Sequence, residues 1–143
     1  MLIRLIYASR AEEGLTPAKL ALILKHSQTR NDQDSVTGGL AYLDGVFLQY
    51  IEGPDDVIAR TFARIAADPR HRDVKVLERR NIPRRMFSRW SMSLLSWVDE
   101  TRNIFRAFSP GAKIDLYETH ADTAAPLFRA WAGTGHWVDR QLV

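Results

Sequence analysis

Residues 36–53 of the chain read VTGGLAYLDGVFLQYIEG, and this stretch decides the fold. It contains two apolar, β-rich runs, 37–43 and 46–52, which are joined by Asp44 and Gly45. An Asp-Gly pair tolerates the positive φ angles of a tight turn, so the stretch predicts a β-hairpin.

One polar side chain interrupts the second run. Strand alternation puts Gln49 on the same face as Phe47 and Ile51, which read as core residues. A buried amide without partners costs about 1–3 kcal/mol, so it must be hydrogen bonded. Reversing the amide exchanges donor for acceptor without moving any charge, which makes Gln49 a candidate switch. The alternative is a structural glutamine satisfied by the backbone at a strand edge.

Upstream of the hairpin, the sequence predicts a strand and a helix. Residues 2–7 alternate, with Ile3, Leu5 and Tyr7 on one face. Thr16 followed by Pro17 is an N-cap and first-turn signature, and apolar residues then recur at helical spacing. We expect a helix from about 17 to 28, with Asn31 just beyond its end.

Downstream, a second helix follows the hairpin. It begins after Gly53, carries an inward apolar stripe and stops at the Asp68-Pro69 pair. Glu52, Asp55 and Asp56 are expected to cap its start, where carboxylates suit the helix dipole. Two further short strands are expected over 73–81 and 89–97.

The order βαββαββ predicts an α+β fold, a ferredoxin-like and mostly antiparallel sheet with two helices on one face. The first and third strands are neighbours in this topology, so Tyr7 and Gln49 could lie side by side. Two C-terminal helices, 99–108 and about 121–132, are expected to cover the free face of the sheet or a partner. The chain therefore divides into a domain of residues 1–97 and a helical extension of residues 98–143.

Composition excludes several classes of protein. The 143 residues, 45% of them hydrophobic and 26% charged, suit one globular domain with a small appendage. The absence of cysteine excludes disulfides and thiolate chemistry and indicates a cytoplasmic location. No apolar run approaches the roughly 20 residues of a membrane span, so we expect a soluble protein without a membrane partner. The four histidines share no ligand spacing, so no metal site is expected.

Five arginines fall within eleven residues, which raises the question of a nucleic-acid partner; they are Arg79, Arg80, Arg84, Arg85 and Arg89. The stretch is broken by Pro83, lacks aromatic residues for base stacking over 79–85, and no RNP1-like strand occurs elsewhere. We interpret it as a solvated turn, with nucleic-acid binding as the second choice.

Tyr7, Gln49 and Asn31 converge in the predicted fold. A phenol and two amides between two helices make an apolar and aromatic pocket with a few neutral hydrogen-bonding groups. Such a pocket suits a flat heteroaromatic ligand rather than acid, base or metal chemistry.

Residues 36–53 resemble the core signature of BLUF domains, blue-light sensors that use a flavin. Further matches are Tyr7 with Ser9, Asn31, the DPRH sequence at 68–71 and the FSRWSM sequence at 87–92. The resemblance covers about residues 2–97. It implies a photoreceptor rather than an enzyme, followed by a helical tail similar to that of short single-domain members.

The resemblance also implies roles for individual residues. Tyr7 would give an electron and its proton to the excited flavin, and Gln49 would pass the proton and rearrange the hydrogen bonds. The remaining cofactor-binding residues would be Ile23, Arg30, Asn31, Arg64, Ile65, Asp68 and His71. The implied cofactor is FAD, with FMN as the alternative. Trp90 and Met92 would relay the signal, with one or the other approaching Gln49.

Gly39 and Ala41 depart from the family pattern. They stand where larger aliphatic residues are usual, so we expect looser strand packing under the pocket.

The resemblance implies signalling to a separate effector protein, since no output catalytic domain is expected in 143 residues. A homo-oligomer through the back of the sheet or the terminal helices is also expected. Two other functions remain as alternatives, an acylphosphatase-like enzyme and an RNA-binding sheet. The first would need a glycine-rich phosphate loop after the first strand, and residues 9–14, SRAEEG, do not supply one.

Overall fold

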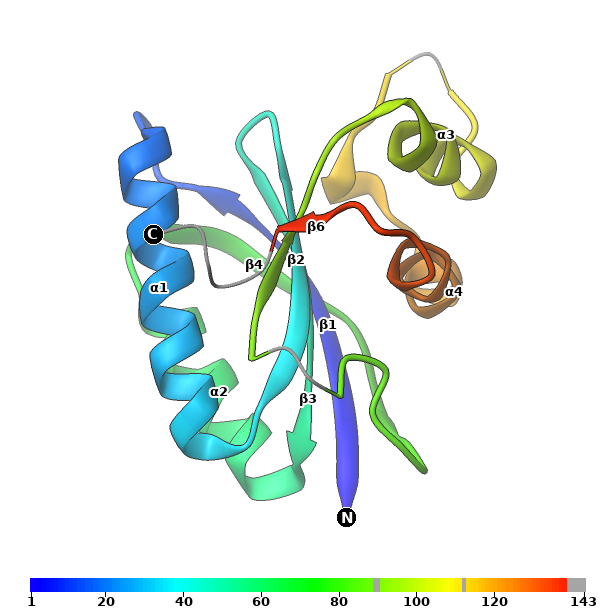
Figure 1. Ribbon diagram of the computed structural model, residues 1–143. Helices are drawn as coiled ribbons and strands as arrows, with labels where there is room; N and C mark the ends of the chain where they lie inside the picture. Colours follow the sequence, from blue (N-terminus) through cyan, green and yellow to red (C-terminus); the bar gives the residue numbers. More distant parts are fainter. Residues whose placement is uncertain (89–90, 112, 139–143) are drawn as a thin grey trace.

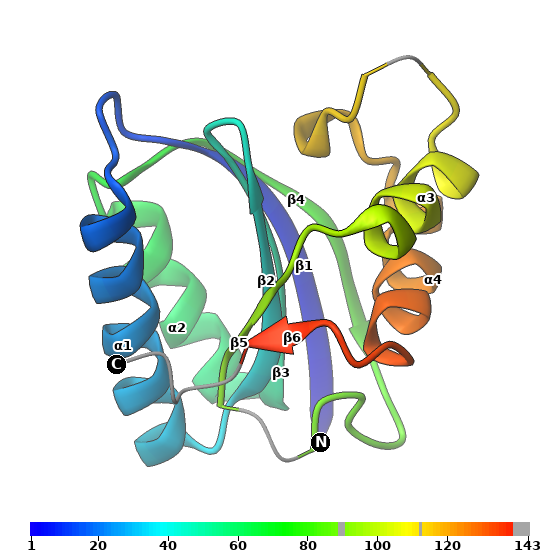
Figure 2. The same ribbon diagram turned by 45° about the horizontal axis from the view of Figure 1, so that its top comes forward.

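The computed structural model describes residues 1–88, 91–111 and 113–138, and it shows one sheet with helices on both faces (Figures 1 and 2). The strand order is β4-β1-β3-β2-β5-β6. Helices α1 and α2 cover one face, called here the front, and α3 and α4 cover the back. In chain order the elements are β1 (Leu2–Ala11), α1 (Pro17–Asp34), β2 (Thr37–Leu43), β3 (Val46–Pro54), α2 (Asp55–Ala67), β4 (His71–Asn81), β5 (Ser93–Leu95), α3 (Asp99–Phe108), the 3-10 turn η1 (Leu116–Glu118), α4 (Ala121–Ala132) and β6 (Trp137–Val138).

The predicted hairpin and the central strand pair are confirmed. Asp44 and Gly45 have φ angles of 51° and 78°, as a tight turn between β2 and β3 requires. Strands β1 and β3 pair antiparallel in the middle of the sheet, and Tyr7 lies directly opposite Gln49. The order β4-β1-β3-β2 of the first four strands is the expected ferredoxin-like arrangement.

Two strands differ from the prediction. The expected strand over 89–97 is reduced to β5, because only Ser93–Leu95 pairs, in parallel with β2. Residues 89 and 90 lie outside the described part of the chain. Strand β6, which the sequence did not predict, adds two residues antiparallel to β5.

Helix α1 is longer than predicted. It continues to Asp34 and ends where Ser35 adopts a left-handed conformation with φ of 59°. The extra turns are stabilised by inward-facing amides: Gln28 and Asn31 donate to the backbone carbonyls of Met92 and Ser91. Asn31 therefore lies within the helix and not beyond it.

The sheet separates two hydrophobic cores. On the front, Ile3, Leu5 and Tyr7 pack with residues of α1 and α2, as the alternation predicted. On the back, Ile6 and Ala8 pack with the C-terminal helices, whose largest buried residue is Trp131. The ranges expected for α3 and α4 are confirmed, and they cover the free face of the sheet.

The loose packing expected at Gly39 and Ala41 is wrong. A Cβ atom at Gly39 would lie 2.8 Å from two ring atoms of Trp137 and 3.0 Å from Phe87. Ala41 is fully buried in the back core. The two small residues make room for aromatic rings, and they do so behind the sheet and not under the pocket.

The capping role expected for Glu52 is also wrong. Asp55 and Asp56 do lie in the first turn of α2, but the Glu52 carboxylate is fully buried. It accepts hydrogen bonds from the backbone N–H groups of Met86 and Phe87.

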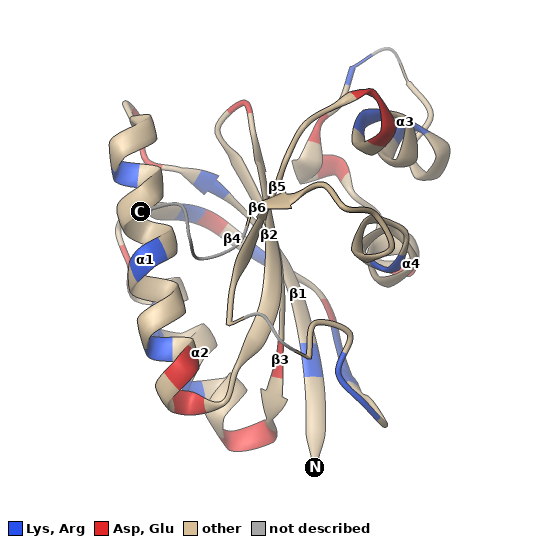
Figure 3. Ribbon diagram, viewed as in Figure 1, with Lys and Arg blue, Asp and Glu red and all other residues tan. Residues whose placement is uncertain are grey.

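Figure 3 shows basic residues at the end of β4, the strand at the edge of the sheet. Arg79 pairs with Asp55, and Arg85 donates to the backbone oxygens of Ser35 and Glu52. Arg79 and Arg85 therefore have their partners within the protein itself. In the described parts of the chain, no helix combines the length and the apolar character needed to cross a bilayer.

Candidate functional site

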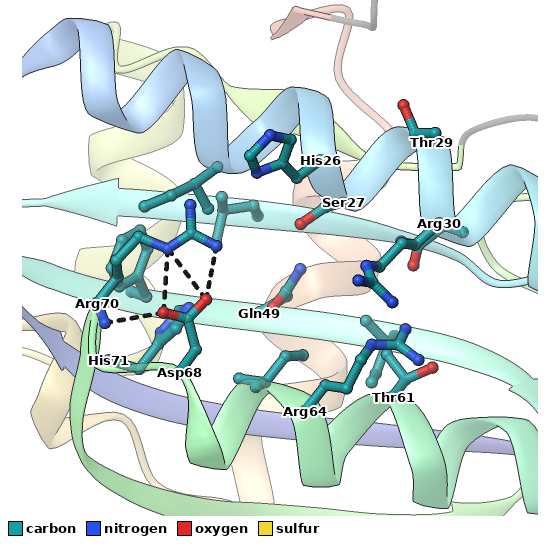
Figure 4. Close-up of a pocket in the computed structure, with 16 residues that line it drawn as sticks. His26, Ser27, Thr29, Arg30, Gln49, Thr61, Arg64, Asp68, Arg70 and His71 are labelled. Atoms are coloured by element: carbon teal, nitrogen blue, oxygen red, sulfur yellow. Dashed lines mark hydrogen bonds and ion pairs between the residues drawn. The ribbon is translucent and has the colours of Figure 1, made fainter.

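A cavity of about 470 Å³ lies between α1, α2 and the front of the sheet (Figure 4). Every predicted cofactor-binding residue except Tyr7 lines it: Ile23, Arg30, Asn31, Gln49, Arg64, Ile65, Asp68 and His71. The remaining lining residues are His26, Ser27, Thr29, Leu40, Phe47, Ile51, Thr61 and Arg70. Pockets of about 300–1,000 Å³ are typical of small-molecule sites.

Tyr7 lies behind the cavity wall and contacts it through Gln49. Its hydroxyl donates a hydrogen bond to Gln49 Oε1, and both side chains are buried. Burial raises the pKa of Tyr7 well above its usual value of 10, with a smaller contribution from the negative charge of Asp68. The phenol is therefore protonated at neutral pH.

The other end of the Gln49 amide is held more weakly. Its Nε2 donates to the thioether sulfur of Met92 at 3.3 Å. A thioether is a weak acceptor, so the amide has one strong and one weak partner. Because β3 is a central strand and both partners are side chains, the alternative of a backbone-satisfied edge glutamine does not apply.

Met92 is the residue that approaches Gln49. Its side chain is 1% exposed and belongs to the front core. Trp90, the other predicted relay residue, lies outside the described residues.

Asn31 and Gln28 connect α1 to Ser91 and Met92, the residues that directly precede β5. Asn31 Nδ2 donates to the Ser91 carbonyl at 2.7 Å, and Gln28 Nε2 donates to the Met92 carbonyl at 3.1 Å. The cavity wall and the segment next to Gln49 are thus joined by two buried amides. Gln28 was not selected from the sequence, because only the packing shows that it faces inward.

A polar cluster closes one end of the cavity. Asp68 accepts from the backbone N–H of Arg70 at 2.9 Å and from its guanidinium at 2.6 Å (Figure 4). These hydrogen bonds hold the pKa of Asp68 below its usual value. Arg70 was missed as a site residue, although its position two residues after an aspartate that ends a helix is typical of such a turn.

His71 occupies the same end of the cavity. Its Nδ1 lies 2.9 Å from Ser9 Oγ, and its ring lies 4.7 Å from that of Phe47. Burial lowers the pKa of His71 below 6.5, partly offset by the negative charge of Asp68. The imidazole is therefore neutral at pH 7.

Two arginines lie on the helices that flank the cavity. Arg64 Nη2 lies 3.6 Å from Asp34 Oδ2 and so joins α2 to α1. Figure 4 shows Arg30 of α1 and Arg64 of α2 extending into the gap between the helices. The walls have apolar surface from Ile23, Leu40, Ile51 and Ile65. The buried Thr61 hydroxyl on the same lining has no hydrogen-bond partner among the described residues. Thr61 was predicted only as part of the inward stripe of α2.

Known proteins share this architecture. The family described as "BLUF: Sensors of blue-light using FAD" matches residues 2–93. The photoactivated adenylate cyclase subunit beta of Euglena gracilis is 34% identical over 90 residues, which are 62% of this chain and 10% of that protein. The chain thus spans about a tenth of the length of that relative.

Two solved structures match nearly the whole chain. The ground state of BlsA has a TM-score of 0.87 and 26% identity, and the match covers 95% of this chain and 91% of that one. The dark state of BlrB, a BLUF protein, has a TM-score of 0.74 and 31% identity, with coverages of 92% and 95%. A family match over residues 2–93, in the region that carries Tyr7 and Gln49, makes this chain a member of the BLUF family of blue-light sensors that use FAD.

Proposed function

We propose that Tyr7 and Gln49 form the light-operated switch of this protein and that the cavity between α1 and α2 holds the isoalloxazine of FAD. The single observation that carries the proposal is the buried hydrogen bond from the Tyr7 hydroxyl to Gln49 Oε1, at the wall of that cavity.

The cavity residues fit a flavin. Apolar walls from Ile23 and Ile65 suit a flat aromatic ring, and Gln49 and Asn31 supply neutral hydrogen-bonding groups. The Thr61 hydroxyl is a buried polar atom left for a ligand, since no described residue pairs with it. Arg30 and Arg64 suit the anionic phosphate end of FAD or FMN, and Asp68 and His71 would contact the ring edge.

The protein's own groups support a reversible proton rearrangement. A bound flavin, excited by blue light, supplies a one-electron oxidant. Tyr7 is kept neutral by burial, so its hydroxyl can release an electron and a proton together without leaving a buried charge. The proton leaves along the hydrogen bond to Gln49 Oε1, and the electron and the proton both return to Tyr7 once the Gln49 amide has turned. Turning the Gln49 amide exchanges Oε1 and Nε2, so it breaks the hydrogen bond from the Tyr7 hydroxyl as well as the weak bond from Nε2 to the Met92 sulfur.

The turned amide presents its donor and its acceptor in exchanged places. No covalent bond in the protein changes, so the original arrangement returns thermally. Met92 loses its partner and is the proposed first residue of the signal relay, together with Trp90.

The division into a sensor of residues 1–97 and an extension of residues 98–143 is supported by the family match, which ends at residue 93.

We further propose that the protein signals to a separate effector protein and acts as a homo-oligomer in the cytoplasm. BlsA, whose chain is matched over 91% of its length, supports the separate effector, because a sensor of about this size exists in both a ground and a photo-activated state. Size-exclusion chromatography with light scattering, in darkness and under blue light, tests the oligomer.

The switch is tested by absorption spectra before and after blue illumination. The wild-type holoprotein is expected to show a reversible red shift of its flavin bands. Tyr7→Phe and Gln49→Leu are expected to bind the flavin but to show no shift, because one lacks the proton and the other lacks the amide. Tyr42→Phe, a tyrosine of β2 that does not line the cavity, is the control and should behave as the wild type. A red shift of normal size in either site variant would remove that residue from the switch.

A further inference from the structure

The chain between β4 and β5 passes from the back of the sheet to the front. Phe87 packs in the back core, with its ring 5.2 Å from Tyr50 and 5.4 Å from Trp137. Met92 packs in the front core against Gln49. We call residues 86–88 and 91–95, the described parts of this region, the crossing segment.

Glu52 holds the back end of the crossing segment. Its Oε1 accepts from Met86 N at 2.7 Å and from the Tyr50 hydroxyl at 3.2 Å. Its Oε2 accepts from Phe87 N at 2.6 Å and from Thr37 Oγ1 at 2.9 Å. The carboxylate is fully buried, so water does not compete for these bonds. The Glu52 carboxylate thus accepts from four donors, two of which are consecutive backbone N–H groups, and it anchors Met86 and Phe87.

The front end of the crossing segment is held by neutral groups. Asn31 and Gln28 donate to the carbonyls of Ser91 and Met92, and Gln49 donates to the Met92 sulfur. Hydrogen bonds to an ionised acceptor are roughly twice as strong as those between neutral groups. A rearrangement at Gln49 therefore loosens the Met92 end before the Glu52 end.

Both ends are fixed to the same strand. Gln49 and Glu52 are three residues apart on β3 and face opposite sides of the sheet, with Tyr50 contacting Glu52 on the back. Strand β3 thus holds the crossing segment at two points, strongly through Glu52 and weakly through Gln49.

We propose that Glu52 is a positioning residue that anchors the crossing segment, confines the light-driven displacement to residues 91–95 and shortens the lifetime of the lit state by opposing that displacement. The inference rests on the proposed Tyr7–Gln49 switch. With residues 86 and 87 fixed, the displacement at Met92 passes into β5, which pairs with β2 and β6. Weakening the anchor lowers the cost of the displaced state, so the lit state then persists longer.

Glu52→Gln tests the anchor in the flavin-loaded protein. The amide keeps the shape of the carboxylate but removes its charge and turns one acceptor into a donor that faces donors. We expect the red shift to keep its wild-type size and dark recovery to slow on the order of tenfold, equivalent to about 1.4 kcal/mol. Glu78→Gln is the matched control, since Glu78 pairs with Arg4 and, among the described residues, does not hydrogen bond to the crossing segment; its recovery should stay within about twofold of the wild type.

Hydrogen exchange, measured in darkness and in light, separates anchoring from general loosening. In the wild type, the amides of Met86 and Phe87 should keep their protection in light, while those of residues 93–95 change. In Glu52→Gln, the amides of Met86 and Phe87 should also lose protection in light. If Glu52→Gln does not fold, Thr37→Val, which removes one donor to Oε2, should show the same effects at smaller size.

Several outcomes would overturn the inference. They are unchanged recovery in Glu52→Gln, equal slowing in Glu78→Gln, or light-dependent exchange at Met86 and Phe87 in the wild type. For Thr37→Val, unchanged recovery overturns it when Glu52→Gln does not fold. Failure of the switch itself is distinguishable, because the wild type would then show no red shift at all.

Discussion

At the scale of single residues, burial sets the protonation state of each titratable group that the switch needs. Tyr7 is fully buried and its pKa is raised, so it holds its proton. His71 is held neutral by burial next to Ser9, and Asp68 is held ionised by Arg70. The two side chains that contact Gln49, Tyr7 and Met92, are therefore neutral, and the charge of Asp68 is paired with Arg70 at the end of the cavity.

His71 predicts a pH dependence of stability. Its pKa in the folded protein lies below the unfolded value of about 6.5, so the unfolded chain takes up the proton first as the pH falls. The stabilisation is present above about pH 6.5 and is lost as the pH falls through the folded pKa. His71→Gln should therefore lose less stability than the wild type between pH 7 and pH 5, measured by urea unfolding.

The control for this prediction is His120→Gln, which replaces an exposed histidine. It should lose as much stability as the wild type over the same interval. An equal loss in His71→Gln would mean that the buried imidazole does not resist protonation.

At the scale of elements, β2 is shaped by what packs behind it. Gly39 faces the rings of Trp137 and Phe87 at distances that leave no room for a side chain. The two-residue strand β6 is thus held by ring packing as well as by its hydrogen bonds to β5. A glycine in a strand interior often marks such a close approach.

Gly39→Val should destabilise the protein by about 1–3 kcal/mol, as overpacking of a filled core does. In the double variant Gly39→Val/Trp137→Ala the bulk is relieved, so the destabilisation should be smaller than the sum of the two single effects. Urea denaturation measures all three variants. Gly111→Val, in open space, is the control and should stay within about 0.5 kcal/mol of the wild type. Additive single effects would show that the two positions do not compete for one volume.

At the scale of the whole molecule, one sheet divides the protein into a ligand-binding side and a covered side. The cavity lies between the front helices, and α3 and α4 close the back around Trp131. Tyr117 joins the extension to the sheet, because its hydroxyl donates to the Asp73 carbonyl at 2.7 Å. Arg10 and Lys75 each lie 4.0 Å from the centre of its ring. We therefore expect the size of the light-induced shift to depend on the front, and the back to contribute mainly to stability and to the lifetime of the lit state.

Trp131→Ala should separate these contributions. Its ring is fully buried and packs edge to face on Phe128 at 5.4 Å, so its loss should cost about 3–5 kcal/mol. The light-induced red shift should remain, because no lining residue of the cavity is touched. Ile51→Ala, on the front, should instead alter the flavin spectrum itself. Loss of the red shift in Trp131→Ala, in protein shown to be folded, would mean that the back core controls the switch.

The sequence by itself determined the order of the helices and strands from β1 to α4 and the hairpin at Asp44 and Gly45. Local rules suffice for these features, since side-chain alternation and turn chemistry act over a few residues. The order of the elements also predicted that the first and third strands are neighbours, but their register came from the structure. Periodicity placed Ile23, Gln49 and Ile65 on inward faces, and the resemblance of the motifs to the BLUF family supplied the other predicted wall residues. Together they account for eight of the sixteen residues that line the cavity.

Only the tertiary structure decided the length of α1, the shortness of β5, the place of Met92 and the roles of Glu52 and Arg70. Each depends on partners far away in the chain: Gln28 and Asn31 on the carbonyls of residues 91 and 92, and Glu52 on amides more than thirty residues later. A buried carboxylate and a helix-capping carboxylate look alike in sequence. What separates them is the desolvation of the carboxylate and the donors that compensate for it, and both exist only once the chain has folded.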